Sequence, residues 1–155
     1  MKFTKGYWMN LPGVTNTDAV QVREVKVEND RVYLYTVPYH ADMRAMGGPL
    51  LEMYISSPQP DIIRTEAYHF MGSNQKMPAF ELNDAHCALE VENTETTVTI
   101  KSGNTKLVIG KNPCSFDYYY KDKKLTSIGN RFGNAMISTV STPDGNYMRA
   151  QMNLD

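Results

Sequence analysis

The chain has 155 residues, of which 41% are apolar and 21% charged, and its formal net charge at pH 7 is -1. Such a length suits one domain that buries roughly 70% of its unfolded surface, and near-neutral charge excludes the electrostatic footprint of a nucleic-acid-binding protein. No apolar run approaches the roughly 20 residues of a membrane span, and residues 1–10 lack the apolar stretch of a signal peptide. We expect a cytoplasmic location, with no nucleic-acid or membrane partner.

Alternation of apolar and polar residues predicts strands along the first half of the chain. After a lead-in over residues 1–13, it indicates a hairpin and two more strands, over residues 18–37, 51–55 and 61–70. The hairpin turns at Asn29-Asp30, because these residues suit a two-residue turn. Residues 38–49, with prolines and adjacent glycines, form a loop. Both faces of residues 61–70 carry bulky groups, so we expect that strand to be partly covered on both sides, with Arg64 and Glu66 paired locally.

The second half continues with shorter strands. Residues 71–84 form a long polar loop, which in a small domain is often an interaction element. Strands follow over residues 86–92, 96–101, 107–109, 116–120, 125–128, 136–140 and 147–154, with turns at residues 93–95, 102–104, 110–113, 121–123 and 143–145. The last strand runs to Asp155 with nothing to cap it. This suggests a piece of a larger protein, with an unpaired sheet edge that makes the isolated chain self-associate.

These strands predict an all-β fold, an antiparallel β-sandwich of two packed sheets. No segment shows a sustained helical period of about 3.6 residues, and no internal repeat appears. We therefore expect a single domain over residues 1–155.

The two cysteines, Cys87 and Cys114, are expected to be free thiols. One bridge between strands is the alternative, but two cysteines in a cytoplasmic chain are more often reduced. A nucleophile pair of Cys114 with His86 is a further alternative, although a cysteine in a strand-rich chain is far more often packed in the core.

The titratable residues show no catalytic or metal-binding pattern. The three histidines, His40, His69 and His86, lack the spacing of metal ligands. There is no phosphate loop and no GxSxG elbow. Glycoside cleavage uses two carboxylates about 5–10 Å apart, but the acids scatter over turns and strands, and each suits a solvated surface charge. We expect no catalytic residue, no metal and no cofactor.

Aromatic side chains support a second hypothesis. Trp8, the only tryptophan, lies beside Tyr7. It either anchors the N-terminal segment to the sandwich or forms a sugar-stacking platform, because aromatic faces bury large area at modest entropic cost. With Tyr39 and the tyrosines at 118–120 as further stacking surfaces, the chain would be an autonomous carbohydrate-binding module.

The succession of these pieces resembles the start of the family 31 glycoside hydrolases, and within them the bacterial α-xylosidases, over essentially the whole chain. The matching segments are Met1-Lys2-Phe3 with Gly6-Tyr7-Trp8, Gln21-Val22 with Glu24-Val25, Pro49-Leu50-Leu51 to Ser56-Ser57-Pro58, Asp61-Ile62-Ile63-Arg64 with His69-Phe70-Met71-Gly72, and Lys101-Ser102-Gly103-Asn104 followed by Pro113 and Phe116. The chain departs from the family in lacking its Gly-Leu-Gly-Glu-Arg-Phe segment and its barrel. It also has Thr65 where an apolar residue is usual.

The resemblance implies both a fold and a role. Members of the family carry an N-terminal β-sandwich related to galactose mutarotase, followed by a (β/α)8 barrel that holds the two catalytic aspartates of a retaining reaction. Because no catalytic position maps onto a residue here, the resemblance implies a non-catalytic domain. It would pack on its own barrel, shape one side of the active-site mouth and help subunits associate, with residues 71–84 as the candidate contact. A purely structural interface domain is the third hypothesis.

Overall fold

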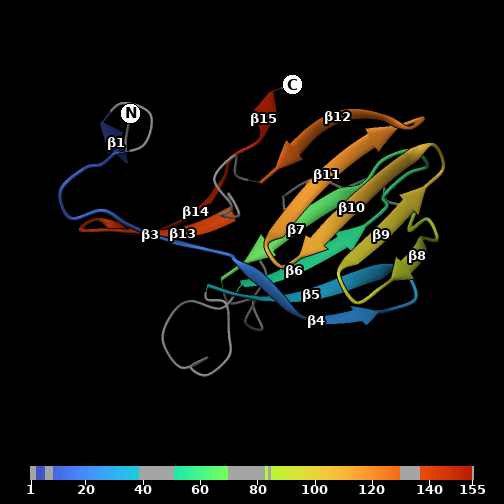
Figure 1. Ribbon diagram of the computed structural model, residues 1–155, viewed down its shortest axis with the longest axis horizontal. Helices are drawn as coiled ribbons and strands as arrows, with labels where there is room; N and C mark the ends of the chain where they lie inside the picture. The colour runs from blue at the N-terminus through green and yellow to red at the C-terminus, as the bar shows by residue number, and fades with distance from the viewer. Residues whose placement is uncertain are drawn as a thin grey trace.

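The structure, a computed structural model, describes residues 3–5, 9–38, 51–69, 83, 85–129 and 137–154. In this part of the chain every regular element is a β-strand, and the strands form four antiparallel sheets (Figure 1). Across the same residues, no helix combines the length and the apolar character that spanning a membrane requires. The predicted all-β class is confirmed.

A four-stranded sheet is built from consecutive strands. It consists of β4 (Gln21–Val27), β5 (Arg31–Val37), β6 (Leu51–Ser56) and β7 (Arg64–Tyr68), in that spatial order. Val27 lies opposite Val32, and the Glu28 amide donates to the Arg31 carbonyl at 2.9 Å. The turn therefore falls at Asn29-Asp30, as the sequence predicts.

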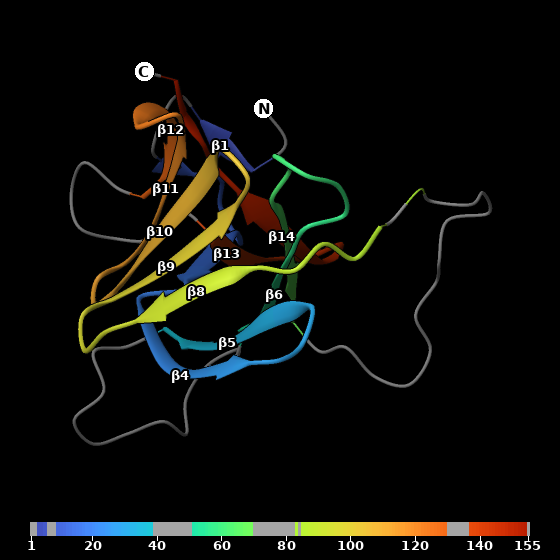
Figure 2. The same ribbon diagram turned by 90° about the vertical axis from the view of Figure 1, so that its right-hand side faces the viewer.

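A six-stranded sheet faces it and is also mostly a meander. It contains β8 (Glu90–Asn93), β9 (Thr97–Ser102), β10 (Thr105–Lys111), β11 (Cys114–Tyr120) and β12 (Lys123–Ile128), and β15 (Asn153–Leu154) pairs with β12 at its edge. Figure 2 shows β8 to β10 lying across β4 to β6 as the second layer of the sandwich.

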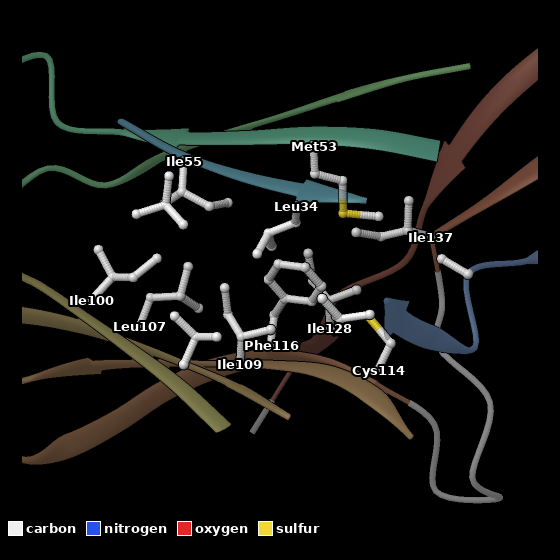
Figure 3. Close-up of a cluster of buried hydrophobic side chains, with 14 of the residues drawn as sticks. Leu34, Met53, Ile55, Ile100, Leu107, Ile109, Cys114, Phe116, Ile128 and Ile137 are labelled. Atoms are coloured by element: carbon white, nitrogen blue, oxygen red, sulfur yellow. The ribbon is translucent and has the colours of Figure 1, made fainter. Parts of the chain in front are cut away.

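The core lies between these two layers, because alternate residues of both sheets point inward. In Figure 3, side chains from the four-stranded sheet meet side chains from the six-stranded sheet. The fully buried members include Leu34, Met53, Ile55, Ile100, Leu107, Ile109 and Phe116, each 0% exposed. Full burial of one such side chain stabilises the fold by roughly 1.5–3 kcal/mol relative to exposure.

Two smaller sheets complete the molecule. β3 (Thr15–Asp18), β13 (Ile137–Thr142) and β14 (Gly145–Ala150) form one, in the order β14-β13-β3, and β1 (Thr4–Lys5) and β2 (Met9–Asn10) form the other. The sequence did not predict β3, and two sheets were expected rather than four. Short strands rich in threonine and asparagine lack the apolar alternation that identifies the others.

Ala19 and Val20 join three sheets within two residues. The Ala19 amide donates to the Ile137 carbonyl of β13 at 2.8 Å, and the Val20 amide to the Val37 carbonyl of β5 at 2.9 Å. The Val20 carbonyl accepts from the Cys114 amide of β11 at 2.7 Å. The chain therefore passes from the three-stranded sheet into the sandwich at Ala19 and Val20. The backbone amides of both residues are hydrogen-bonded there.

Asp61 fixes a second junction, between the turn before β7 and the β9–β10 hairpin. Its carboxylate accepts from the Asn104 amide at 2.5 Å, and its carbonyl accepts from the Thr105 hydroxyl at 2.6 Å. Asp61 has φ 65° and Gly103 has φ 57°. The predicted strand over residues 61–70 is therefore too long, because Asp61 belongs to a left-handed turn and β7 begins at Arg64.

Other strand boundaries also differ from the prediction. The strand expected over residues 86–92 begins only at Glu90, because His86 has φ 46°, outside the extended region. The break expected over residues 110–113 is shorter, since β10 runs to Lys111 and the turn is Asn112-Pro113, with a cis peptide bond. The expectations for residues 39–49 and for most of residues 71–84 fall outside the described residues.

The final strand is not one strand. The expected strand over residues 147–154 divides into β14, which pairs with β13, and β15, which pairs with β12 of the six-stranded sheet. Asn153 holds the end of β15 by donating from its amide group to the Gly129 carbonyl at 2.9 Å. The prediction that this segment forms a single uncapped edge strand was therefore wrong.

Candidate functional site

The residues that carry reactive groups do not come together in the described part of the chain. Cys114 packs in the core, as predicted, and is 1% exposed, whereas His86 is exposed at the surface, with its Nδ1 3.4 Å from Asp30 Oδ2, so the alternative of a Cys114–His86 nucleophile pair finds no support. Burial raises the pKa of the Cys114 thiol to about 12, which disfavours the thiolate. Both cysteines are free, as predicted.

Metal binding finds no support among the residues that the structure describes. They contain no group of three or more His, Cys, Asp or Glu side chains able to hold a metal ion. His69 is exposed at the end of β7, and His40 lies outside the described residues.

The aromatic residues singled out from the sequence are dispersed. The carbohydrate-binding-module hypothesis would use Tyr118 as a stacking surface, but its side chain packs against the core, and its hydroxyl lies 2.9 Å from the Thr65 hydroxyl of the other sheet. Desolvation accordingly raises the pKa of Tyr118. Tyr120 is 37% exposed, and Tyr7, Trp8 and Tyr39 lie outside the described residues.

A different group of aromatic side chains lies on the outer surface of the four-stranded sheet. Tyr33 of β5 lies opposite Tyr54 of β6, with ring centroids 5.3 Å apart and an interplanar angle of 55°. Tyr54 in turn meets Tyr68 of β7 edge to face, at 6.1 Å and 69°. The three rings form a continuous row across three strands, because residues two apart on each strand share one face. We call this row and the charged groups around it the tyrosine face.

Carboxylates hold two of the three phenols. The Tyr33 hydroxyl donates to Glu52 Oε1 at 3.2 Å, and the Tyr68 hydroxyl donates to Glu66 Oε1 at 3.0 Å. Desolvation, with the hydrogen bond to Glu52 next, raises the pKa of Tyr33 to about 12. The pKa of Tyr68 is raised by desolvation and then by its bond to Glu66. Both phenols therefore stay protonated donors at neutral pH.

Cations flank the same rings. Lys26 Nζ lies 5.3 Å from the Tyr33 ring centroid, and the Arg31 guanidinium lies 4.8 Å from that of Tyr54. Each cation also has an acidic neighbour: Lys26 Nζ is 3.1 Å from Glu24, and Arg31 Nε is 2.5 Å from Glu28. Arg64 Nε is 3.4 Å from Glu66 Oε2, which confirms the local pair predicted from the sequence.

Sequence reasoning missed the tyrosine face because it depends on register. The alternation of Tyr33 and Tyr35 with Val32 and Leu34 was visible, but which residue of β6 lies opposite Tyr33 was not. Chemically, the face offers ring surfaces, fixed hydroxyl donors, carboxylate acceptors and guanidinium donors. These groups suit non-covalent recognition, since none of them is an activated nucleophile.

No family model matches the chain. Its fold is similar to that of an uncharacterized protein from Listeria monocytogenes EGD-e, with 19% identity and a TM-score of 0.61 over 85% of this chain and 11% of that one. The same values hold for a cycloalternan-forming enzyme from Listeria monocytogenes in complex with a pentasaccharide substrate. The Listeria uncharacterized protein in complex with α-D-glucose, β-D-glucose, magnesium and calcium gives 17% identity and a TM-score of 0.58 over 88% of this chain and 11% of that one.

These likenesses show the fold: an antiparallel β-sandwich of this shape occurs within much longer chains. The present chain spans 11% of the length of the structures it matches.

Proposed function

We propose that this chain is the non-catalytic N-terminal β-sandwich domain of a glycoside hydrolase, an α-xylosidase that releases α-linked xylose with retention. The observation that carries the proposal is the shared fold with an enzyme solved in complex with a pentasaccharide substrate, at a TM-score of 0.61. The family resemblance of the sequence supports the choice of α-xylosidase.

The proposed role is structural. The sandwich packs on its own catalytic barrel, borders the active-site mouth and contributes to subunit contacts in a cytoplasmic homo-oligomer. The packed core and the junctions at Ala19-Val20 and at Asp61 suit a scaffold, because they hold the described strands of both large sheets together. Deleting residues 73–76 in the full enzyme tests the contact role of the loop over residues 71–84: oligomer size or kinetics should change.

A hydrolysis assay with a chromogenic α-xyloside distinguishes the isolated domain from the longer protein that contains it. The isolated 155-residue chain should give no turnover above background, and the longer protein that contains it should hydrolyse the substrate. Turnover by the purified chain alone would contradict the non-catalytic assignment. If the longer protein is inactive on α-xylosides but active on another glycoside, the substrate assignment is wrong and the proposed role as a non-catalytic domain stands.

The alternative is an autonomous carbohydrate-binding module that acts without a catalytic partner. The row of three tyrosines on an outer sheet surface favours it. The residues that follow Asp155 in the native gene discriminate. A (β/α)8 barrel with two catalytic aspartates supports the leading proposal, and a different module or a stop supports the alternative.

A further inference from the structure

The geometry points to the tyrosine face as a binding site for a neutral oligosaccharide of pyranose units. The inference rests on the proposed function for the class of ligand. The inference comes from three properties of the described residues: the order of the rings, the balance of charge and the kind of polar group that surrounds them.

The row of rings is held in place before any ligand arrives. Tyr54 contacts both neighbouring rings, at 5.3 and 6.1 Å between centroids. Tyr33 and Tyr68 are each fixed at the far end by a hydrogen bond to a glutamate. A ligand that binds such a surface orders few side chains, so less of its binding energy is lost to conformational entropy.

Charge balance selects a neutral ligand. The three cations of the face each lie within 3.4 Å of a glutamate: Lys26 with Glu24, Arg31 with Glu28 and Arg64 with Glu66. A phosphate, a nucleic acid or an acidic peptide would need an excess of positive charge, and the face supplies none. Glu52 adds a fourth carboxylate to the three cations and three glutamates, but the Tyr33 hydroxyl already holds it, so a basic ligand would also compete with groups already in place.

The polar groups favour a sugar over a protein partner. Protein interfaces are depleted of charged residues at their core. The reason is that the desolvation penalty of a buried ion pair is about as large as the free energy gained from its attraction. Here charged side chains surround and interleave the rings, so a protein covering the face would bury them. A sugar has apolar ring faces for aromatic contact and hydroxyl groups for carboxylates and guanidinium groups, and it leaves much of the face wet.

Calorimetry on the 155-residue chain tests the inference. The probes are xylotetraose and maltotetraose, titrated separately. At least one should bind with a dissociation constant of roughly 1 mM or tighter, about -4 kcal/mol.

Tyr54→Ala removes the central ring and should weaken binding at least tenfold. Tyr147→Ala is the matched control: it removes a tyrosine whose ring also meets another aromatic ring, that of Phe3 at 5.2 Å between centroids, but on β14 of the three-stranded sheet. Its affinity should match that of the wild type.

Tyr33→Phe serves as a second variant that keeps the ring and loses only the bond to Glu52. It should weaken binding about three- to tenfold while lowering the thermal midpoint by only a few degrees, so that the protein stays folded at the temperature of the titration. Absence of binding to both sugars would overturn the inference, and so would equal affinities for wild type and Tyr54→Ala. Light scattering that shows Tyr54→Ala dissociating an oligomer, with no sugar bound by either protein, would assign the face to a protein contact instead. None of these outcomes touches the proposed domain role, which depends on the α-xyloside assay and the downstream gene sequence.

Discussion

Gly103 occupies a position where two separate constraints exclude a side chain. Its φ of 57° lies in the left-handed region, and a Cβ there would stand 2.2 Å from Asp61 Oδ1. That carboxylate cannot withdraw without losing its hydrogen bond to the Asn104 amide. The close approach of the two turns therefore requires glycine.

Gly103→Ala should lower the free energy of unfolding by about 2 kcal/mol, through backbone strain and displacement of Asp61. Urea denaturation followed by circular dichroism measures it. In an Asp61→Ala background the clash is gone, so the same change should cost only about 1 kcal/mol. Equal costs in both backgrounds would show that Asp61 does not set the constraint.

Asp18 makes the folding stability depend on pH. It lies opposite Ser138 of β13, which in turn lies opposite Arg149 of β14. Desolvation raises the pKa of Asp18 above its usual 3.8, despite a hydrogen bond from Ser138 and the nearby Arg149, which both lower it. A carboxyl group with a raised folded-state pKa favours folding while it is protonated, and that contribution is lost as the pH rises through the folded-state pKa.

Asp18→Asn should therefore raise the free energy of unfolding at pH 7, because the amide keeps an oxygen acceptor for Ser138 and carries no charge to desolvate. The gain should shrink as the pH falls through the raised folded-state pKa and should be lost below 3.8, where Asp18 is protonated in both the folded and unfolded states. Thermal unfolding of both proteins at neutral and acid pH measures the difference. A variant that is less stable than the wild type at pH 7 would mean that the attraction to Arg149 outweighs desolvation.

Strand β11 links the two layers of the sandwich through one polar contact. The Tyr118 and Thr65 hydroxyls lie 2.9 Å apart between the sheets. The Tyr118 hydroxyl therefore gives the partly buried Thr65 hydroxyl a hydrogen-bonding partner in the opposite sheet.

Tyr118→Phe should cost about 1 kcal/mol, since it leaves the Thr65 hydroxyl without that partner. Thr65→Val in the same chain removes the second hydroxyl, and the double variant should recover part of the loss. Chemical denaturation of the four proteins forms a double-mutant cycle. A coupling energy near zero would indicate that the two hydroxyls do not bond.

Period-two alternation predicted the long strands well, because β5, β6, β9 and β10 each bury one face. It failed where backbone conformation decides the boundary, as at Asp61 and His86, whose positive φ angles end the extended chain. It also failed at residues 151–152, where the chain leaves one sheet for another. The tyrosine face required the register of three strands, which depends on turn geometry rather than on the pattern within one strand.

At the scale of the whole molecule, the junction at Ala19 and Val20 makes the three-stranded sheet part of the sandwich. The buried position of β13 points the same way, since Ile137 and Val140 are 2% and 0% exposed. We therefore expect the sheets to unfold together as one cooperative unit.

Native-state hydrogen exchange measures this cooperativity. Backbone amides of β13 should exchange with the same free energy of opening as those of β5 and β10, within about 1 kcal/mol. Protection of β13 that is several kcal/mol lower would show that the small sheet opens independently, and the junction would then not transmit the stability of the sandwich.

The pairing of β3 with β13 brings Thr17 opposite Thr139, whereas each large sheet is mainly a meander of successive strands. Loop closure makes such distant pairing slow to form. During synthesis on the ribosome, residues 15–18 emerge early, and their backbone edges stay open until β13, more than 110 residues later in the chain, has been translated. Nascent chains stalled so that β12 but not β13 has left the ribosome should therefore already contain both meanders and still expose β3 to chaperones.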